Sequence, residues 1–468
     1  MNDEERVKLE PVAMPELAVN DRLAGFDEVN RGYSAEQARA EAERCLQCKK
    51  APCWAGCPVD VDIPSFIELL RAGECLQAAL KIKETNAFPA ICGRVCPQER
   101  QCQETCVLAR KGKPINIGYL ERFVGDYLIQ QPQSAAAAPA ASGFRVAVIG
   151  SGPAGLAAAG DLAKAGHQVV IFEALHEPGG VLIYGIPEFR LPNITVGHEI
   201  EALQELGVEI RTNTLVGRTL TAEDLFGRLG FDAVFLGLGA GAPIFLGIPG
   251  ENLPGVMSAN EFLTRVNLMR AFRDDYDTPV QRGRQVVVIG GGNVAIDSSR
   301  SALRLGAETV TLLYRRTRAE LPARIEGVRH AEEEGVIFQF LVAPVRFLEA
   351  NGHLAGVECL RMELGEPDES GRRRPVPVPG SEFVVPTDQA IVAVGARVNP
   401  SARLVMPGMK QDEKGHIVVD PETLMTSVPG VFAGGDVVGG EETVIRGLSD
   451  GRRAAKAIDE YLRSKQPK

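Results

Sequence analysis

The sequence lacks an excess of positive charge, and it lacks a long uninterrupted hydrophobic run. Its 51 lysines and arginines are outnumbered by 61 aspartates and glutamates, so the formal net charge is -10. This balance argues against nucleic acid and anionic membrane surfaces as partners. The most apolar stretches are interrupted by glycine turns and charges, and none of them predicts a membrane-spanning helix.

A secretion leader is also missing, because the opening residues MNDEERVKLE are charged throughout and no apolar core follows them. We therefore expect a cytoplasmic protein. In a long chain without a leader, ten cysteines indicate metal or redox chemistry rather than a disulfide framework. The length of 468 residues is sufficient for about three domains.

Nine of the ten cysteines lie between Cys45 and Cys106, in two groups of four and one isolated member. The spacing within each group is short, so one loop or helix end can place several sulfurs around one metal centre. Two clustered quartets favour two [4Fe-4S] clusters, whereas structural zinc sites usually show two separated pairs of ligands. A zinc-bound docking module without a redox role stays open as the alternative. The groups are Cys45, Cys48, Cys53 and Cys57, and Cys92, Cys96, Cys102 and Cys106.

We expect residues 1–130 to form a helical domain around these cysteines. Ser34 and Gln37 form a capping pair and predict the start of its first clear helix. Residues 131–143 are low in complexity and without hydrophobic periodicity, which is typical of a linker.

The stretch from Arg145 to Glu173, RVAVIGSGPAGLAAAGDLAKAGHQVVIFE, predicts a strand, a glycine turn, a helix and a second strand. The three turn glycines allow a tight bend, a close approach of the backbone to a pyrophosphate and close packing of helix on strand. Glu173 ends the second strand, where a carboxylate can accept hydrogen bonds from ribose hydroxyls. The predicted FAD site consists of Gly150, Gly152, Pro153, Ala154, Gly155 and Glu173, with Gly180 in the loop that follows.

A second copy of the same unit spans residues 284–316, and such a repeat is much less probable by chance than either copy alone. In place of the terminal carboxylate this copy has Arg315 and Arg316, and arginine is the residue expected beside a 2'-phosphate. We therefore expect it to prefer NADPH over NADH, although a solvated strand end is the alternative for this arginine pair. Its turn and helix start contribute Gly290, Gly292, Asn293 and Ala295.

Near the end of the sequence, GVFAGGD predicts a strand, a glycine turn and an acid, followed by a helix from about Thr443. Gly435 and Asp436 are expected beside the ribityl chain of a flavin, with the helix N-terminus stabilising negative charge on the reduced ring. The expected fold class is α/β, with two Rossmann-like dinucleotide-binding domains (FAD and NADPH) preceded by an α-helical iron-sulfur domain. The expected ranges are 144–280 and 386–468 for the FAD-binding domain and 281–385 for the NADPH-binding domain.

Together with the cysteine motifs CLQCKKAPCWAGCP and CGRVCPQERQC, these two units resemble the glutamate synthase small (beta) subunit family. The resemblance covers nearly the whole chain, including YRRTRAELPAR and TSVPGVFAGGD. It implies that Cys92 is not a ligand, and that a carboxylate replaces one thiolate at the second cluster. The implied ligand sets are Cys45, Cys48, Cys53 and Cys106 for one cluster, and Cys57, Cys96, Cys102 and Glu121 for the other.

The resemblance implies an NADPH-dependent oxidoreductase that passes electrons from NADPH through FAD and two [4Fe-4S] clusters to a partner subunit. We expect no catalytic acid or base to act on the hydride itself. Thioredoxin reductases share the two-unit layout, but they place a C-x-x-C dithiol in the pyridine-nucleotide domain, where this chain has only Cys359. Electrons are therefore expected to leave through the clusters.

The implied partner is the large glutamate synthase subunit, where the electrons would serve glutamate synthesis from glutamine and 2-oxoglutarate. This chain has no glutaminase nucleophile or FMN barrel, so it could not perform that chemistry alone. The alternative partner is a smaller subunit with a flavin and a [2Fe-2S] cluster. In that case this chain would resemble the NADPH-binding subunit of the electron-bifurcating NADH-dependent ferredoxin:NADP oxidoreductase, and ferredoxin would be a further partner.

Overall fold

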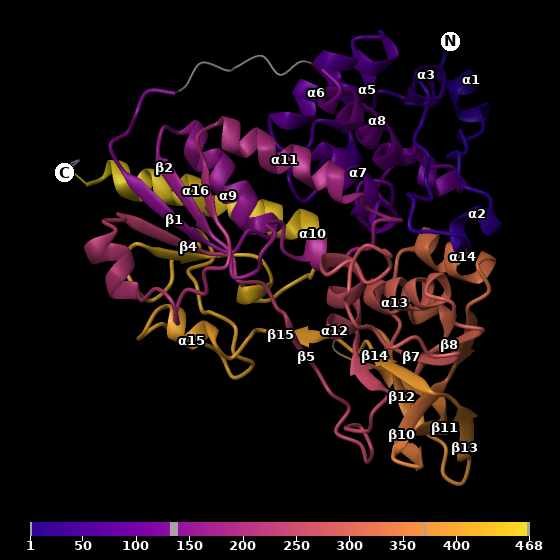
Figure 1. Ribbon diagram of the computed structural model, residues 1–468. Coiled ribbons are helices and arrows are strands. Elements are labelled where there is room, and N and C mark those ends of the chain that lie inside the picture. The colour runs from indigo at the N-terminus through magenta and orange to yellow at the C-terminus, as the bar shows by residue number, and fades with distance from the viewer. Residues whose placement is uncertain (1, 132–138, 369–370, 466–468) are drawn as a thin grey trace.

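The computed structural model describes residues 2–131, 139–368 and 371–465. A helical N-terminal part and two α/β units lie side by side, and the N-terminal part contacts both units (Figure 1). Among the described residues, no helix is long and apolar enough to cross a membrane. Residues 132–138 of the predicted linker lie outside the described residues.

The N-terminal part is helical, and the capping box predicted for its first clear helix is confirmed. Gln37 N donates to Ser34 Oγ at 3.2 Å, and Ser34 N donates to Gln37 Oε1 at 2.9 Å. Two of its helices, α7 and α8, cross closely because Gly93 has no side chain. A Cβ at Gly93 would lie only 2.4 Å from Arg122 N. The helices are α1 (Asp3–Lys8), α2 (Val19–Leu23), α3 (Ala35–Glu43), α4 (Pro52–Ala55), α5 (Ile63–Arg71), α6 (Cys75–Lys83), α7 (Pro89–Val95), η1 (Gln98–Arg100), η2 (Val107–Lys111) and α8 (Ile117–Ile129).

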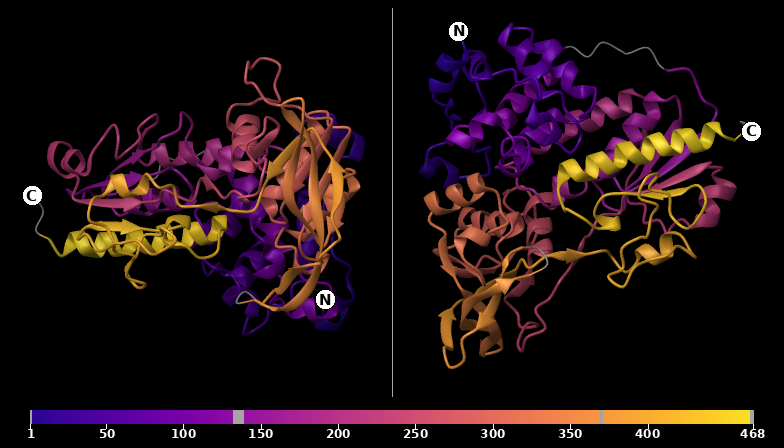
Figure 2. Two further views of the ribbon diagram at one scale, coloured as in Figure 1. Left: turned by 90° about the horizontal axis from the view of Figure 1, so that it is seen from below. Right: turned by 180° about the vertical axis from the view of Figure 1, so that it is seen from behind.

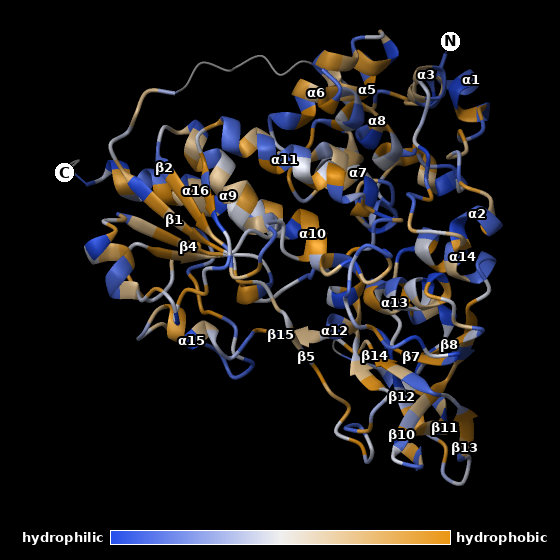
Figure 3. Ribbon diagram, in the orientation of Figure 1, coloured by the Kyte–Doolittle hydropathy of each residue, from blue (hydrophilic) through white to orange (hydrophobic). Residues whose placement is uncertain are grey.

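The first α/β unit is built on a parallel sheet with the strand order β16-β4-β1-β2-β3. Its central strands are buried apolar runs, and they are orange in Figure 3. The helices α9 and α16 contact each other and the sheet. The elements are β1 (Arg145–Ile149), α9 (Pro153–Lys164), β2 (Gln168–Phe172), α10 (Val181–Tyr184), α11 (Asn193–Glu205), β3 (Glu209–Arg211), η3 (Asp224–Arg228), β4 (Ala233–Leu236), α15 (Ala402–Val405), β16 (Val431–Ala433), η6 (Asp436–Val438) and α16 (Val444–Arg463).

The second unit is inserted within the first and has a parallel sheet with the order β6-β14-β7-β8-β9. Antiparallel strands β10 to β13 form a separate sheet beside it (Figure 1). The elements of this unit are β6 (Val256–Ser258), α12 (Ala259–Leu263), η4 (Thr264–Leu268), β7 (Gln285–Ile289), α13 (Asn293–Arg304), β8 (Thr309–Tyr314), η5 (Arg318–Glu320), α14 (Ile325–Glu333), β9 (Ile337–Phe340), β10 (Val342–Ala350), β11 (His353–Pro367), β12 (Arg373–Pro377), β13 (Phe383–Pro386) and β14 (Gln389–Val392).

The second sheet extends beyond the predicted range 281–385. Ile391 of β14 pairs with Met257 of β6 on one side and with Val288 of β7 on the other. A short antiparallel ribbon of β5 (Ala242–Pro243) and β15 (Ala396–Arg397) joins the two units. We therefore propose boundaries that follow the strand pairing, with 144–241 and 398–468 in the first unit and 256–392 in the second.

The N-terminal part bridges the two units. Lys83 Nζ lies 3.3 Å from Glu199 Oε2 on α11 of the first unit. Tyr119 OH donates to Glu326 Oε1 at 2.6 Å on α14 of the second unit, and Arg100 donates to backbone carbonyls just before α14. These contacts fix the N-terminal part against both units, and Figure 2 shows the same arrangement from two further directions.

Candidate functional site

The first glycine turn joins β1 to α9. Gly150 has a φ of +98°, and a Cβ there would lie 2.4 Å from the carbonyl oxygen of Gly237, so only glycine fits. A Cβ at Gly155 would lie 1.9 Å from the carbonyl oxygen of Gly150, which shows how closely α9 packs on the turn. At Gly152, by contrast, φ is -70° and a Cβ would meet nothing within 4 Å. The open space over Gly152 fits a pyrophosphate, which would lie at the N-terminus of α9.

Glu173 lies at the carboxyl end of β2, next to this turn. Its Oε2 accepts from Ser151 N at 2.9 Å, and its Oε1 accepts from Leu175 N at 2.8 Å. These backbone donors fix both carboxylate oxygens at the edge of the sheet. A carboxylate has about four acceptor positions, so this side chain can also accept from ribose hydroxyls.

Gly180 and Gly435 lie against the same turn. A Cβ at Gly180 would lie 2.8 Å from Gly152 Cα, and a Cβ at Gly435 would lie 3.1 Å from Ala154 Cβ. Pro153 is the first residue of α9. The structure thus brings the turn residues predicted for the FAD site together at one edge of the first sheet.

Asp436 directly follows Gly435 and is the first residue of η6. Burial raises its pKa to about 6, and the carboxylates of Glu442 and Asp450 act in the same direction. A hydroxyl that donates a hydrogen bond to Asp436 would favour its charged form. The side chain is therefore suited to a polyol such as the ribityl chain of a flavin.

The second glycine turn repeats the geometry of the first. Gly290 has a φ of +147°, and a Cβ there would lie 2.2 Å from the carbonyl oxygen of Ala393. At Gly292 a Cβ would meet nothing within 4 Å, which again leaves space for a pyrophosphate. Ala295 is fully buried where α13 packs on the sheet, and Asn293 Oδ1 accepts from the backbone N of Arg324 at 2.9 Å.

The two arginines after β8 differ in their surroundings. Arg315 is exposed. Arg316 is buried, its guanidinium lies 2.5 Å from Asp368 Oδ2, and its Nε donates to the carbonyl oxygen of Arg373 at 2.7 Å. Arg316 therefore ties the end of β8 to the β11–β12 hairpin, and Arg315 is the member of the pair that a phosphate in solvent can reach.

Three cysteines that are close in sequence and a fourth that lies farther along the chain line one cavity in the N-terminal part. Burial, followed by the neighbouring thiols, raises the pKa of Cys45 to about 11 and that of Cys53 to about 12. Crowded, half-buried thiols of this kind become thiolates when a cationic metal centre binds them. The donor set therefore fits a metal centre, and its members are Cys45, Cys48, Cys53 and Cys106.

A second group surrounds Glu121 on α8. Glu121 is 8% exposed, its Oε1 accepts from Asn86 Nδ2 at 2.7 Å, and burial raises its pKa to about 8. Burial and then the nearby Glu121 carboxylate raise the pKa of Cys57 to about 12, and they raise the pKa of Cys102 well above its ordinary value. The structure therefore places a carboxylate beside thiols, although the sequence around Glu121 alone would suit a surface helix.

Cys96 and Cys92 belong to the same neighbourhood. The side-chain hydrogen bond with Cys92, together with burial, raises the pKa of Cys96 well above its ordinary value. Cys92 Sγ donates to Asn86 Oδ1 at 3.5 Å. Asn86 thus contacts both Cys92 and Glu121. It belongs to no sequence motif, so its place beside these two side chains could not be predicted from the sequence.

The spacing of the sulfurs distinguishes a cluster from a single zinc ion. Zinc with Zn–S bonds of about 2.3 Å in a tetrahedron requires sulfurs roughly 3.8 Å apart. In the described parts of the chain, the one group of three possible ligand atoms within 4.8 Å of one another is Glu16, Glu326 and His330, which contains no cysteine. No three cysteine sulfurs of the described residues therefore lie as close together as the ligands of one zinc ion, a spacing that suits a larger cluster better.

Sequence reasoning did not identify Phe189 and Arg190, which lie in the loop between α10 and α11 and contact α13 of the second unit. Arg190 Nη1 lies 2.5 Å from Asp297 Oδ2 on α13. The guanidinium groups of Arg300 and Arg304 lie 4.5 and 4.1 Å from the centre of the Phe189 ring. These contacts tie a loop of the first unit to the helix that follows the second glycine turn, and the sequence signal is a single aromatic–arginine pair within a proline-rich loop.

Two family models match the chain. The family described as "Dihydroprymidine dehydrogenase domain II, 4Fe-4S cluster" matches residues 22–133. The family described as "Pyridine nucleotide-disulphide oxidoreductase" matches residues 144–451. The boundary between the two matches coincides with the end of the helical part and the start of the first sheet.

Two curated relatives and one solved structure resemble the chain, and the matches cover different shares of those proteins. The NADP(+)-dependent formate dehydrogenase subunit beta of Moorella thermoacetica is 43% identical over 441 residues, which cover 88% of this chain and 60% of that protein. The Glutamate synthase [NADPH] small chain of Escherichia coli (strain K12) is 37% identical over 467 residues, which cover 97% of this chain and 98% of that protein. Mycobacterium tuberculosis FprA in complex with NADPH shares the fold, with a TM-score of 0.57 and 21% identity over 69% of this chain and 85% of that chain.

Proposed function

Because the chain belongs to the glutamate synthase small-chain family and is an NADPH-dependent oxidoreductase, we propose that it passes electrons from NADPH through FAD and two [4Fe-4S] clusters to a partner subunit. The chain spans 60% of the length of its formate dehydrogenase relative and 98% of its glutamate synthase relative. These relatives belong to different enzymes, so the activity of the whole assembly and the identity of the partner are part of the proposal.

The observation that carries the proposal is the presence, in one chain, of two dinucleotide turns and two crowded groups of metal-type ligands. Each turn leaves open space over its second glycine, and the ligand groups lie in a part that contacts both units. Cys359, the one cysteine of the nucleotide-binding units, is buried. No dithiol is available there to take electrons from a flavin, which favours the clusters as the exit.

The proposed ligand sets follow the two groups of side chains. When bound, such clusters supply one-electron transfer, and the protein adjusts their potentials through ligand type, hydrogen bonds and burial. A carboxylate at one corner of the second cluster is the proposed adjustment, with Asn86 orienting it. The sets are Cys45, Cys48, Cys53 and Cys106 for the first cluster, and Cys57, Cys96, Cys102 and Glu121 for the second.

In each proposed nucleotide site, the backbone of the glycine turn binds the pyrophosphate and side chains bind other parts of the nucleotide. The turn at Gly152 and the carboxylate of Glu173 would hold FAD, with Asp436 at its ribityl chain. The turn at Gly292 would hold NADPH, with Arg315 beside the 2'-phosphate. No side chain needs to take or give a proton in the hydride step, so the main contribution of the protein there is positioning.

The proposal is tested by identifying the partner. Mass spectrometry of the intact complex, isolated natively without oxygen, would show what co-purifies with the chain. A very large partner, with NADPH oxidation that needs both glutamine and 2-oxoglutarate, would support a role in glutamate synthesis. A smaller flavin-containing partner, with NADPH oxidation that needs NAD and ferredoxin, would support the bifurcating alternative. A chain that is isolated without flavin or iron would overturn the proposal.

A further inference from the structure

We propose that the loops around the first cysteine group form a docking surface for an acidic one-electron redox protein. The inference rests on the proposed function, because it requires electrons to leave through this group. It adds where the partner binds and which surface chemistry the partner presents.

The first cysteine group lies closer to solvent than the second. Cys45, Cys48, Cys53 and Cys106 are all half-buried, whereas in the second group Cys96 and Cys102 are buried and Cys57 is half-buried. Val107 lines the same cavity as the first group and is itself exposed. An electron carrier that docks over this cavity would approach the first group more closely than the second.

An apolar centre lies on this surface. Trp54, the single tryptophan of the chain, is 41% exposed on α4, between Cys53 and Cys57. Val107 is 37% exposed and directly follows Cys106. Exposed tryptophan and aliphatic side chains next to the cysteines of one cavity are typical of a binding hot spot, because they gain from being covered by a partner.

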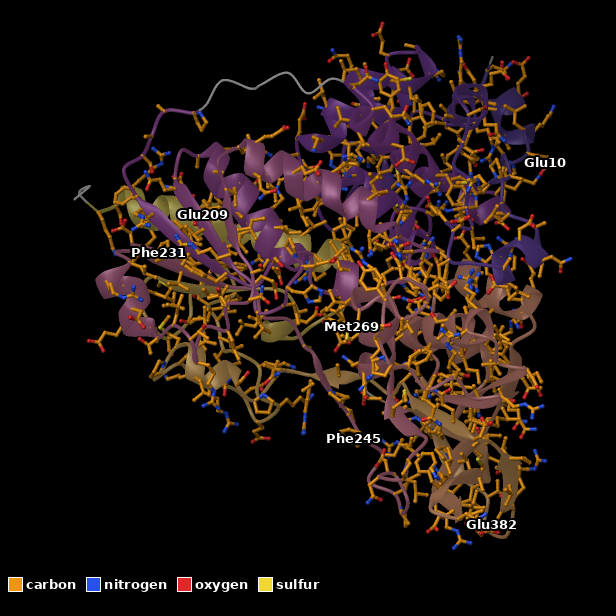
Figure 4. All side chains as sticks on the ribbon, in the orientation of Figure 1. Glu10, Glu209, Phe231, Phe245, Met269 and Glu382 are labelled. Atoms are coloured by element: carbon orange, nitrogen blue, oxygen red, sulfur yellow. The ribbon has the colours of Figure 1, made fainter. Side chains whose placement is uncertain are left out.

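Basic residues lie on the two loops that carry Cys48 and Cys106, and we define the basic rim as Lys49, Lys50, Arg110 and Lys111. All four side chains are exposed, and none has a carboxylate oxygen within 4.0 Å in the part of the chain that the structure describes. Lys113 is excluded from the rim because it forms an ion pair with Glu10, which is labelled in Figure 4.

The rim is a local excess of positive charge in a chain with a net charge of -10. Glu104 is the exposed acidic residue on the same loops, and Asp3 acts on the pKa of Cys48 from α1. On the two loops themselves, four unpaired cations therefore face one exposed acid, Glu104, while Asp3, Glu4 and Glu5 are exposed acids on α1. Complementary charge steers association and fixes orientation, so the rim selects a partner with an acidic face.

The test uses the full-length protein with its flavin and clusters, and an acidic plant-type [2Fe-2S] ferredoxin as the probe. One NADPH supplies two electrons, so its oxidation to NADP+ and a proton reduces two ferredoxin molecules. A regenerating system keeps NADPH in large excess over NADP+, because plant-type ferredoxin has a low reduction potential and the excess is needed to drive its reduction. Reversal of two rim charges (Lys49→Glu with Lys50→Glu) should lower the rate of ferredoxin reduction about tenfold or more at low ionic strength. The difference should shrink at high salt, because screening weakens the rim.

The controls separate docking from assembly. Lys410→Glu with Lys456→Glu reverses two exposed lysines of the first unit and should leave the ferredoxin rate unchanged. A neutral quinone, which needs no protein docking, should be reduced at the wild-type rate by every variant. If the Lys49→Glu, Lys50→Glu variant loses iron, the Arg110→Glu, Lys111→Glu variant replaces it. This second variant reverses the two rim charges on the other loop and should show the same salt-dependent loss of ferredoxin reduction.

The outcomes distinguish the two proposals. Ferredoxin reduction that is equally fast in the rim and control variants, with full iron content, would overturn the docking surface. An equal loss of rate in rim and control variants would also overturn it, because net charge alone would then explain the effect. Wild-type protein that reduces the quinone but not ferredoxin would overturn the docking surface, whereas failure of NADPH to reduce even the quinone would overturn the proposed function itself.

Discussion

The substitution Gly152→Ala separates the dinucleotide site from the stability of the fold. Gly152 has φ -70° and ψ -178°, which alanine adopts without strain, and the added Cβ meets no protein atom within 4 Å. The apoprotein should therefore be as stable as the wild type or more stable by about 0.4–1 kcal/mol, since alanine restricts the unfolded chain.

FAD affinity should fall in the same variant, because the methyl group occupies the space proposed for the pyrophosphate. Displacing the phosphates would weaken one or two charge-assisted hydrogen bonds, each worth about 1.5–3 kcal/mol. A loss of about 3 kcal/mol corresponds to a Kd increase on the order of 100-fold.

The assay pairs thermal unfolding of the apoprotein with titration of FAD fluorescence. Gly155→Ala is the matched control, because its Cβ would lie 1.9 Å from the carbonyl oxygen of Gly150 and should lower Tm. A Gly152→Ala protein that binds FAD with wild-type affinity would refute the placement of the pyrophosphate.

Three further predictions concern other parts of the molecule. Arg315→Ala should raise the KM for NADPH about tenfold without changing the KM for NADH, and equal effects on both nucleotides would contradict the role of Arg315. Arg316→Ala should instead lower the free energy of unfolding by about 1–3 kcal/mol, because it loses the contact with Asp368. Arg190→Ala should lower Tm by leaving the Asp297 carboxylate buried without its partner, and adding Asp297→Asn should restore Tm; no recovery in the double variant would count against this ion pair. Burial lowers the pKa of His330 in the folded protein below its value of about 6.5 in the unfolded chain. Above about pH 6.5 the imidazole is neutral in both states, and as the pH falls toward the folded-state pKa the unfolded chain binds the proton first, so the free energy of unfolding decreases. Between pH 7.5 and 5.5, His330→Gln should therefore lose less Tm than the wild type, and an identical loss would refute this contribution.

The sequence predicted the elements whose signals are local. The turns at Gly150 and Gly290 follow apolar strands and precede helices, so spacing alone located them. The capping pair Ser34 and Gln37 and the helix after Thr443 were predictable for the same reason, since their hydrogen bonds join residues close in sequence.

Features that depend on distant pairing were not predictable from the residues alone. β6 joins the second sheet only through β14, more than a hundred residues later, so the predicted boundary at 281 cut the sheet. Arg316 looked equivalent to Arg315 until the hairpin carrying Asp368 placed a carboxylate beside it. Asn86 has no motif, and its contact with Glu121 appears only because α7 and α8 cross at glycine.

The central claim is that one chain connects NADPH to flavin and to iron-sulfur clusters. The most direct test is an anaerobic titration of the purified full-length chain with NADPH, followed by visible absorbance and by iron and zinc analysis of the same sample. The account predicts about eight irons and little zinc per chain, with NADPH bleaching both the flavin band and the broad iron-sulfur absorbance. Stoichiometric zinc, or bleaching of the flavin band in a protein without iron, would contradict it.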